Sequence, residues 1–95
     1  MRLEDLCNPV TVRILRYILR QGQANVSRIS RELGIHHRIV RKHMSELVRA
    51  GIVEEVRYER MRIYMARLRD PAVSALREVL EELERVVSLL GGADG

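Results

Sequence analysis

A segment bounded by two glycines, Gly34 and Gly51, restricts the possible folds of this chain more than any other feature. Apolar residues recur inside it at helical spacing: Val40, Met44, Leu47 and Val48. This spacing predicts a helix over residues 37–49 that buries one stripe, while charged and polar side chains cover its other side. Gly51 then stops the helix, and the β-branched residues Ile52 and Val53 predict that a strand follows.

The residues before Gly34 predict a second helix close to the first. Asn25 can cap a helix over residues 26–33, and Gly34 supplies the left-handed residue that ends it. Only residues 34–36 separate the two helices, and this spacing is typical of a helix-turn-helix.

An earlier helix is expected over residues 10–21. Asn8-Pro9 stands before it, an asparagine that can cap the helix and a proline that the first turn tolerates. Its predicted buried stripe consists of Ile14, Leu15, Ile18 and Leu19. The three helices together can enclose one small core.

Two segments in which apolar and charged residues alternate, 52–58 and 61–68, predict a β-hairpin. Glu59-Arg60 between them is a plausible two-residue turn, although it lacks the usual glycine or asparagine. One side of the hairpin is expected to carry Ile52, Val56 and Tyr58, with Ile63 and Met65 as partners across the ladder. A hairpin after a helix-turn-helix is a candidate wing.

The last helix is expected over residues 70–90, because Asp70-Pro71 repeats the cap-and-proline start. Its apolar residues follow a heptad-like a/d spacing: Val73, Leu76, Leu80, Leu83, Val87 and Leu90. A helix this apolar either packs on its own domain or pairs with a second copy, and we expect pairing into a homodimer. Residues 91–95 are expected to form a flexible tail.

Charge is segregated along the chain. Residues 1–69 carry 15 Lys/Arg against 7 Asp/Glu, whereas residues 70–95 carry 2 against 6. A basic body favours a polyanion as partner, and the acidic segment is expected to face away from it. The alternative explanation is an arginine-rich, heat-adapted composition without a polyanion partner.

We expect the recognition surface on the outer side of helix 37–49 and on the wing. The candidate DNA-binding residues are His36, His37, Arg38, Arg41, Lys42, Ser45, Arg28, Arg57, Arg60 and Arg62. Arg38 and Arg41 suit bidentate contacts to guanine, and Lys42 suits a phosphate contact. Wing arginines suit a narrow minor groove. The alternatives are a solvated charged face on the helix and, on the hairpin, arginines that protect an edge strand from aggregation.

Several other functions have little support in the sequence. The three histidines and Cys7 lack the spacing of a metal site, so neither a metal nor another cofactor is expected. The sequence contains no nucleophile–base arrangement and no phosphate-binding glycine loop, so we do not expect an enzyme. Aromatic residues make up only 3% of the chain, which favours duplex DNA over single strands.

The location of the protein follows from two further features. The segment Met1-Arg2-Leu3-Glu4-Asp5 places acids where a signal peptide would be apolar, and no run is long enough to span a membrane. A single cysteine fits a reducing compartment. We therefore expect a cytoplasmic protein that does not bind membranes.

Residues 25–35, 40–44 and 47–53 resemble the winged helix-turn-helix core of ArsR-like regulators, in particular the small archaeal regulators with a trailing dimerisation helix. The Ala50-Gly51-Ile52-Val53 exit into the wing is the most specific part of this resemblance, which covers about residues 9–68. The resemblance implies a dimeric transcriptional regulator that contacts DNA through His37, Arg38, Arg41, Lys42 and Arg60. The cysteine-rich motif of the metal-sensing members is missing from the chain, so the resemblance does not imply an effector.

The sequence thus predicts a mainly α fold with a β-hairpin. We expect a winged helix-turn-helix domain over residues 1–69, a C-terminal dimerisation helix over 70–90 and a tail over 91–95. The expected function is sequence-specific regulation of transcription by a homodimer on double-stranded DNA. The alternatives are a sequence-tolerant architectural DNA-binding protein and a winged-helix module for protein–protein interaction.

Overall fold

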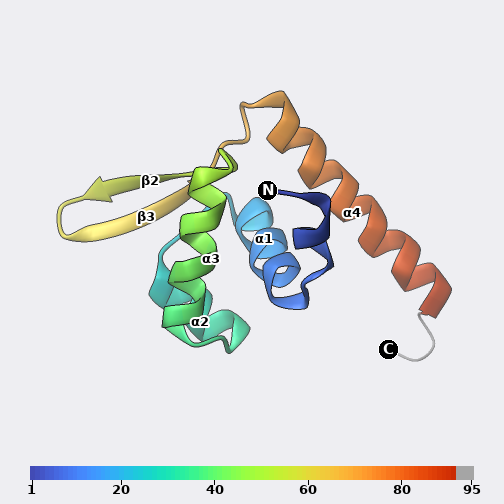
Figure 1. The fold of residues 1–95 in the computed structure, drawn as a ribbon, viewed down its shortest axis with the longest axis horizontal. Helices are drawn as coiled ribbons and strands as arrows, with labels where there is room; N and C mark the ends of the chain where they lie inside the picture. The colour runs from blue at the N-terminus through green and yellow to red at the C-terminus, as the bar shows by residue number, and fades with distance from the viewer. Residues whose placement is uncertain (92–95) are drawn as a thin grey trace.

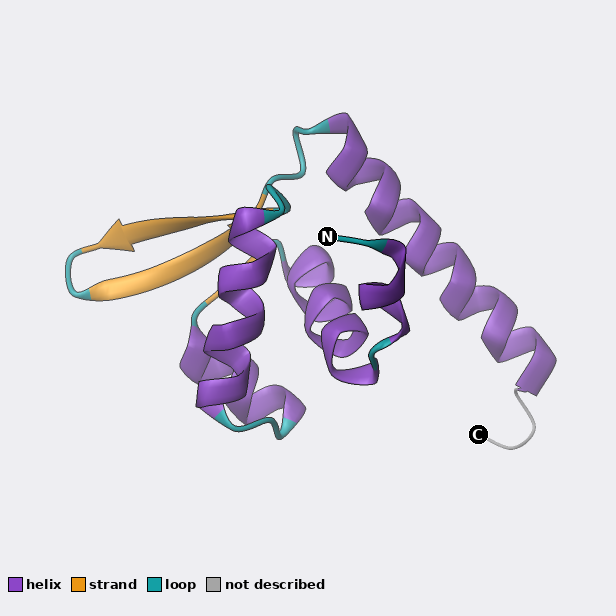
Figure 2. Ribbon diagram, in the orientation of Figure 1, coloured by secondary structure: helices purple, strands orange, loops and turns teal. Residues whose placement is uncertain are grey.

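The computed structural model describes residues 1–91, and Figures 1 and 2 show its helices and its small sheet. The elements are a short 3₁₀ helix η1 (Leu3–Cys7), α1 (Pro9–Gln21), β1 (Gln23–Ala24), α2 (Val26–Leu33), α3 (His37–Arg49), β2 (Val53–Tyr58), β3 (Met61–Ala66) and α4 (Pro71–Gly91). The predicted winged helix-turn-helix with a C-terminal helix is confirmed.

Side-chain caps fix where the helices begin. The Asn8 Oδ1 accepts a hydrogen bond from the Val10 N–H at 2.9 Å at the start of α1. The Asn25 Oδ1 accepts from the Arg28 N–H at 2.8 Å at the start of α2. Gly34 ends α2 with a φ of 65°, a left-handed conformation that strains residues with a side chain. Both predicted caps and the predicted turn are confirmed.

The core lies where α1, α2 and α3 meet. The following side chains are at most 1% exposed: Ile14, Leu15, Ile18, Leu19, Ile29, Val40, Met44 and Leu47. The stripe predicted for residues 10–21 is fully buried, and of the stripe predicted for residues 37–49 all but Val48, which is half-buried. Since α3 packs on this core along one side only, its other side is left facing outward (Figure 1).

The sheet has the order β1-β3-β2, so the wing hairpin gains a third, very short strand. The Glu59-Arg60 turn is confirmed, and Glu59 itself adopts the positive φ of 58° that glycine usually supplies there. Val56 lies opposite Ile63 as predicted, whereas Met65 lies opposite Glu54. Residues 23–24, for which the sequence predicts no strand, pair with β3 as the strand β1.

The C-terminal helix α4 divides into two parts. Val73 and Leu80 are buried in the chain's own core, and Leu76 is half-buried against it. Beyond them the helix projects past α1 (Figure 2). The apolar side chains of α4 that are exposed are Val79, before Leu80, and Leu83, Val86, Val87, Leu89 and Leu90 after it. Within residues 1–91, no helix has the length and apolarity needed to cross a membrane. Of the expected tail, Gly91 is the last residue of α4 and residues 92–95 lie outside the described part.

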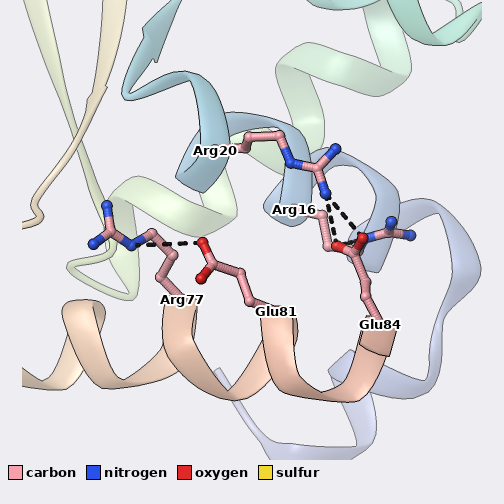
Figure 3. A network of polar contacts seen from close by, with 5 residues as sticks. All are labelled: Arg16, Arg20, Arg77, Glu81 and Glu84. Carbon is pink, nitrogen blue, oxygen red and sulfur yellow. Dashed lines mark hydrogen bonds and ion pairs between the residues drawn. The ribbon is translucent and has the colours of Figure 1, made fainter. Parts of the chain in front are cut away.

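An ion-pair network fastens α4 to α1 (Figure 3). The Arg16 Nε donates to Glu84 at 2.7 Å, and a terminal nitrogen of Arg20 donates to the same carboxylate at 2.9 Å. The pKa of Glu84 is lowered, above all by the hydrogen bond from Arg16 and further by the charges of both arginines. Arg77 and Glu81 form a looser pair beside it, at 4.0 Å. Because Arg16 and Arg20 lie outside the buried stripe of α1, the helical period alone does not identify their partner in α4.

Replacing Glu84 with glutamine is expected to reduce stability by about 1 kcal/mol, since the network is partly exposed. Because folding lowers the pKa of this carboxyl, its contribution is present above the ordinary pKa of 4.5 and is lost as pH falls through the lower, folded-state value. Urea unfolding of both proteins at neutral and at acidic pH measures the difference. Glu78→Gln, on an exposed side of α4, is the matched control. A stability difference for Glu84→Gln that does not shrink in acid contradicts this interpretation.

Candidate nucleic-acid interface

The outer side of α3 carries the residues that the sequence singled out. All five are exposed: His37, Arg38, Arg41, Lys42 and Ser45. Arg38, Lys42 and Ser45 follow one another at i, i+4 and i+7, so they form one strip along the helix. His37 and Arg41 form a second strip nearer to α2. Ile39 is 43% exposed, as expected for a residue at the edge of the core.

The first turn of α3 is organised by two histidines. The Nδ1 of His36 accepts a hydrogen bond from the Arg38 N–H at 3.1 Å, so His36 caps the start of α3. The His37 ring stacks on the His36 ring with centroids 4.3 Å apart. The pKa of His37 is lowered by the neighbouring His36 first, and then by slight burial and by the charges of Arg41 and Arg38.

A hollow of about 510 Å³ connects α3 to the wing, and we call it the wing hollow. Its lining consists of Asn25, Val26, Ser27, Arg41, Arg60, Met61, Arg62 and Tyr64. Three arginines from two elements therefore converge on one concave surface. Figure 1 shows how this is possible, because the hairpin extends away from the helical core on the side of α3.

A second hollow, of about 490 Å³, lies between α2 and α3, and we call it the helix hollow. Its lining consists of Val26, Ser27, Ser30, Arg31, His37 and Arg41. Arg41 and Ser27 line both hollows, so the two form one continuous cationic surface. Among the described residues that line them, none is acidic.

The three wing arginines differ in the side chains that they contact. Arg57 and Arg62 lie directly opposite each other in the ladder, where like charges repel. The Nε of Arg62 pairs with Glu55 at 3.3 Å, whereas Arg60 stands at the exposed turn. A polyanion at this hairpin would relieve the repulsion between Arg57 and Arg62.

Arg28 is held by contacts within and beside α2, and several residues that line the hollows were not expected. Arg28 contacts Gln21 at 3.4 Å and Glu32 at 3.8 Å and lines neither hollow. The α2 residues in the two hollows are instead Ser27 and Arg31, with Asn25 and Ser30 beside them. Ser27 and Arg31 are four residues apart, so the helical period could have placed them on one face once the orientation of α2 was known.

The remaining histidine and the cysteine do not join this surface. The Nδ1 of His43 lies 3.3 Å from the Thr11 hydroxyl and 3.5 Å from Glu46, so His43 packs between α1 and α3. Cys7 is exposed next to the start of α1. Within residues 1–91, His, Cys, Asp and Glu side chains form no group of three that could hold a metal ion.

The acidic part of the chain lies away from these hollows. The exposed carboxylates of α4 are those of Glu78, Glu81 and Glu82. Figure 1 shows α4 on the far side of α1 from α3 and the hairpin. The charge segregation along the sequence thus becomes a separation in space, as predicted.

Comparisons with known proteins agree with this fold. A family model described as a helix-turn-helix domain matches residues 6–56. No curated protein sequence matches the chain significantly.

Solved structures with the same fold include three informative cases. A transcriptional regulator homologue from Pyrococcus horikoshii is 26% identical with a TM-score of 0.68, over 95% of this chain and 91% of that one. The transcriptional repressor PagR of Bacillus anthracis is 19% identical with a TM-score of 0.68, over 82% and 86%. Sso10a-2, a DNA-binding protein from Sulfolobus solfataricus, is 23% identical with a TM-score of 0.65, over 86% and 85%.

Proposed function

The chain belongs to the helix-turn-helix domain family, and on that basis we propose that it regulates transcription by binding specific sequences of duplex DNA. The position of Arg41 is the main support for this proposal, because its side chain lines both the wing hollow and the helix hollow. A family of DNA-binding regulators also agrees with the expectation that the chain is not an enzyme. We further propose that the protein is of the ArsR-like type.

In this proposal α3 enters the major groove. Arg38 and Arg41 each carry a guanidinium that can grip guanine O6 and N7 in a bidentate contact. Lys42, farther along the same side, contacts a phosphate, and Ser45 adds a weaker polar contact. The wing arginines Arg57, Arg60 and Arg62 follow the backbone into the adjacent minor groove, where a narrow groove attracts them. His36 positions this turn through its cap.

We propose that the exposed half of α4 pairs with a second copy. Val73, Leu76 and Leu80, which we expected in the pairing seam, are packed on the chain's own core. The seam left for a partner is Val79, Leu83, Val86 and Leu90, with Val87 beside it, and each of these residues is at least 39% exposed. Their 4-3-4 spacing retains the a/d rhythm of a paired helix. Burial of each such side chain contributes about 1.5–3 kcal/mol, enough together to support a dimer.

A second candidate function is supported by the likeness in fold to the Sulfolobus DNA-binding protein. The same cationic surface could hold duplex DNA of any sequence through its phosphates alone, as an architectural protein does. Selection of bound fragments from a random duplex pool separates the two candidates. A regulator should enrich one motif and bind it about 10³-fold or more above random DNA. Uniform affinity favours the architectural role, and no binding at low salt leaves the protein-interaction module.

Alanine substitutions on α3 test the assigned roles. Arg41→Ala is expected to cost about 1–3 kcal/mol on the selected site and to relax the preference for one base. Lys42→Ala is expected to weaken all duplexes alike and to reduce the salt slope by about one. Arg49→Ala, at the exposed C-terminal end of α3, is the matched control and should change little. Binding isotherms at several salt concentrations measure all three, and equal behaviour of the Arg41 and Lys42 variants contradicts the assignment.

A further inference from the structure

The stacked histidine pair at the start of α3 has two members with different bonding. The Nδ1 of His36 accepts the Arg38 N–H, so this nitrogen must be without a proton and the ring carries its proton on Nε2. The Nδ1 of His36 is thus engaged as the acceptor that caps α3. The His37 ring, stacked 4.3 Å away, makes no such bond among the described residues and is fully at the surface. His37 is therefore the member that is free to change its charge.

Positive charge surrounds His37 on both helices that pack around it. On α3 its cationic neighbours are Arg38 and Arg41, beside the His36 ring, and across the helix hollow on α2 stands Arg31. The other polar groups of that hollow are the hydroxyls of Ser27 and Ser30. Among the described residues lining this hollow, none is a carboxylate that could offset these cations. The free protein therefore disfavours a charged His37, and its pKa lies below the ordinary 6.5.

Bound DNA would change the electrostatic potential at the His37 ring from positive to negative. Phosphates within a few ångströms of the α3 N-terminus favour the charged form of an imidazole and neutralise the arginines that oppose it. We propose that His37 takes up one proton from solvent when the protein binds DNA, so that DNA affinity rises as pH falls. This inference rests on the proposed function, because it requires α3 to face phosphates.

The direction and size of the effect follow from proton linkage. A group that binds a proton only in the complex strengthens binding by at most about tenfold per pH unit for each protomer. The slope appears between the pKa of His37 in the free protein, below 6.5, and its higher value in the complex.

The test measures DNA affinity of the full chain across the interval around neutral and mildly acidic pH. The probe is one short duplex of mixed sequence, held at constant ionic strength. His37→Gln keeps a polar side chain that does not titrate, and His37→Arg carries a permanent charge. His43→Gln, whose ring lies against Thr11 away from both hollows, is the matched control. Circular dichroism of each variant verifies that it is folded.

We expect the wild type and His43→Gln to bind several-fold more tightly for each pH unit of acidification. His37→Gln should lose that slope and match the wild type at high pH, while His37→Arg should lose it and match the wild type at low pH. A slope that persists unchanged in His37→Gln overturns the inference and leaves DNA binding intact. Failure to bind DNA at any pH and low salt overturns the proposed function itself.

Discussion

Glutamate at both Leu83 and Val86 is expected to convert the proposed α4-paired dimer to a monomer. These side chains are 52% and 39% exposed in the single chain, so the substitution does not disturb the core. In a two-fold pair of α4 helices, it would place four carboxylates in a seam that otherwise excludes water. Burying even one unpaired charge costs several kcal/mol, which exceeds what the remaining apolar contacts supply.

Sedimentation of the wild type and the double variant over a range of concentrations measures this change. DNA binding provides a second readout, because two linked recognition helices bind about 10²-fold or more tightly than one. We therefore expect the monomeric variant to lose about that factor on a palindromic site while its fold is retained. Leu80→Glu is not a suitable variant, because Leu80 is part of the chain's own core.

The matched control changes polar residues on the same half of α4. Glu82→Gln and Arg85→Gln alter exposed side chains outside the apolar seam and should leave the dimer unchanged. A dimer that persists in the Leu83→Glu, Val86→Glu variant would place the contact elsewhere on the chain. A wild type that sediments as a monomer at every concentration would remove the pairing role of α4 altogether.

Local rules were sufficient to predict most of the fold. Asn8, Asn25 and Gly34 determine helix ends through bonds and backbone angles that involve only their immediate neighbours. The buried stripes follow from the helical period, which also leaves the cationic side of α3 outward. The hairpin register was harder to predict, because Glu59 rather than a glycine adopts the positive φ at the turn.

The features that the sequence did not reveal all depend on contacts between distant segments. Strand β1 is two residues long and has no pattern of its own, and it exists because β3 lies beside it. The apolar residues of α4 look alike in sequence, and only the position of α1 decides that Leu80 is buried while Leu83 is not. Similarly, the orientation of α2 brings Arg31, rather than Arg28, beside Arg41. A spacing rule identifies faces of a helix but not which neighbour each face meets.

The packing of α2 on the core is expected to be highly sensitive to substitution. Ile29 is fully buried and is the one residue of α2 that reaches the centre of the core. Ile29→Ala removes three carbon atoms there and leaves a cavity, which typically costs about 2–5 kcal/mol. Because small domains have a total stability of only about 5–15 kcal/mol, this single change approaches the limit of folding.

Thermal and urea unfolding of the variant measure the loss. Glu32→Ala, an exposed residue of the same helix whose ion pair with Arg28 is long at 3.8 Å, is the control and should change stability by less than about 0.5 kcal/mol. DNA affinity measured at low temperature, where the variant is still folded, is expected to fall as well, because α2 sets the position of Ser27 and Arg31 in the helix hollow. Normal stability in Ile29→Ala would mean that the core can close around the cavity and that α2 is held mainly by its polar contacts.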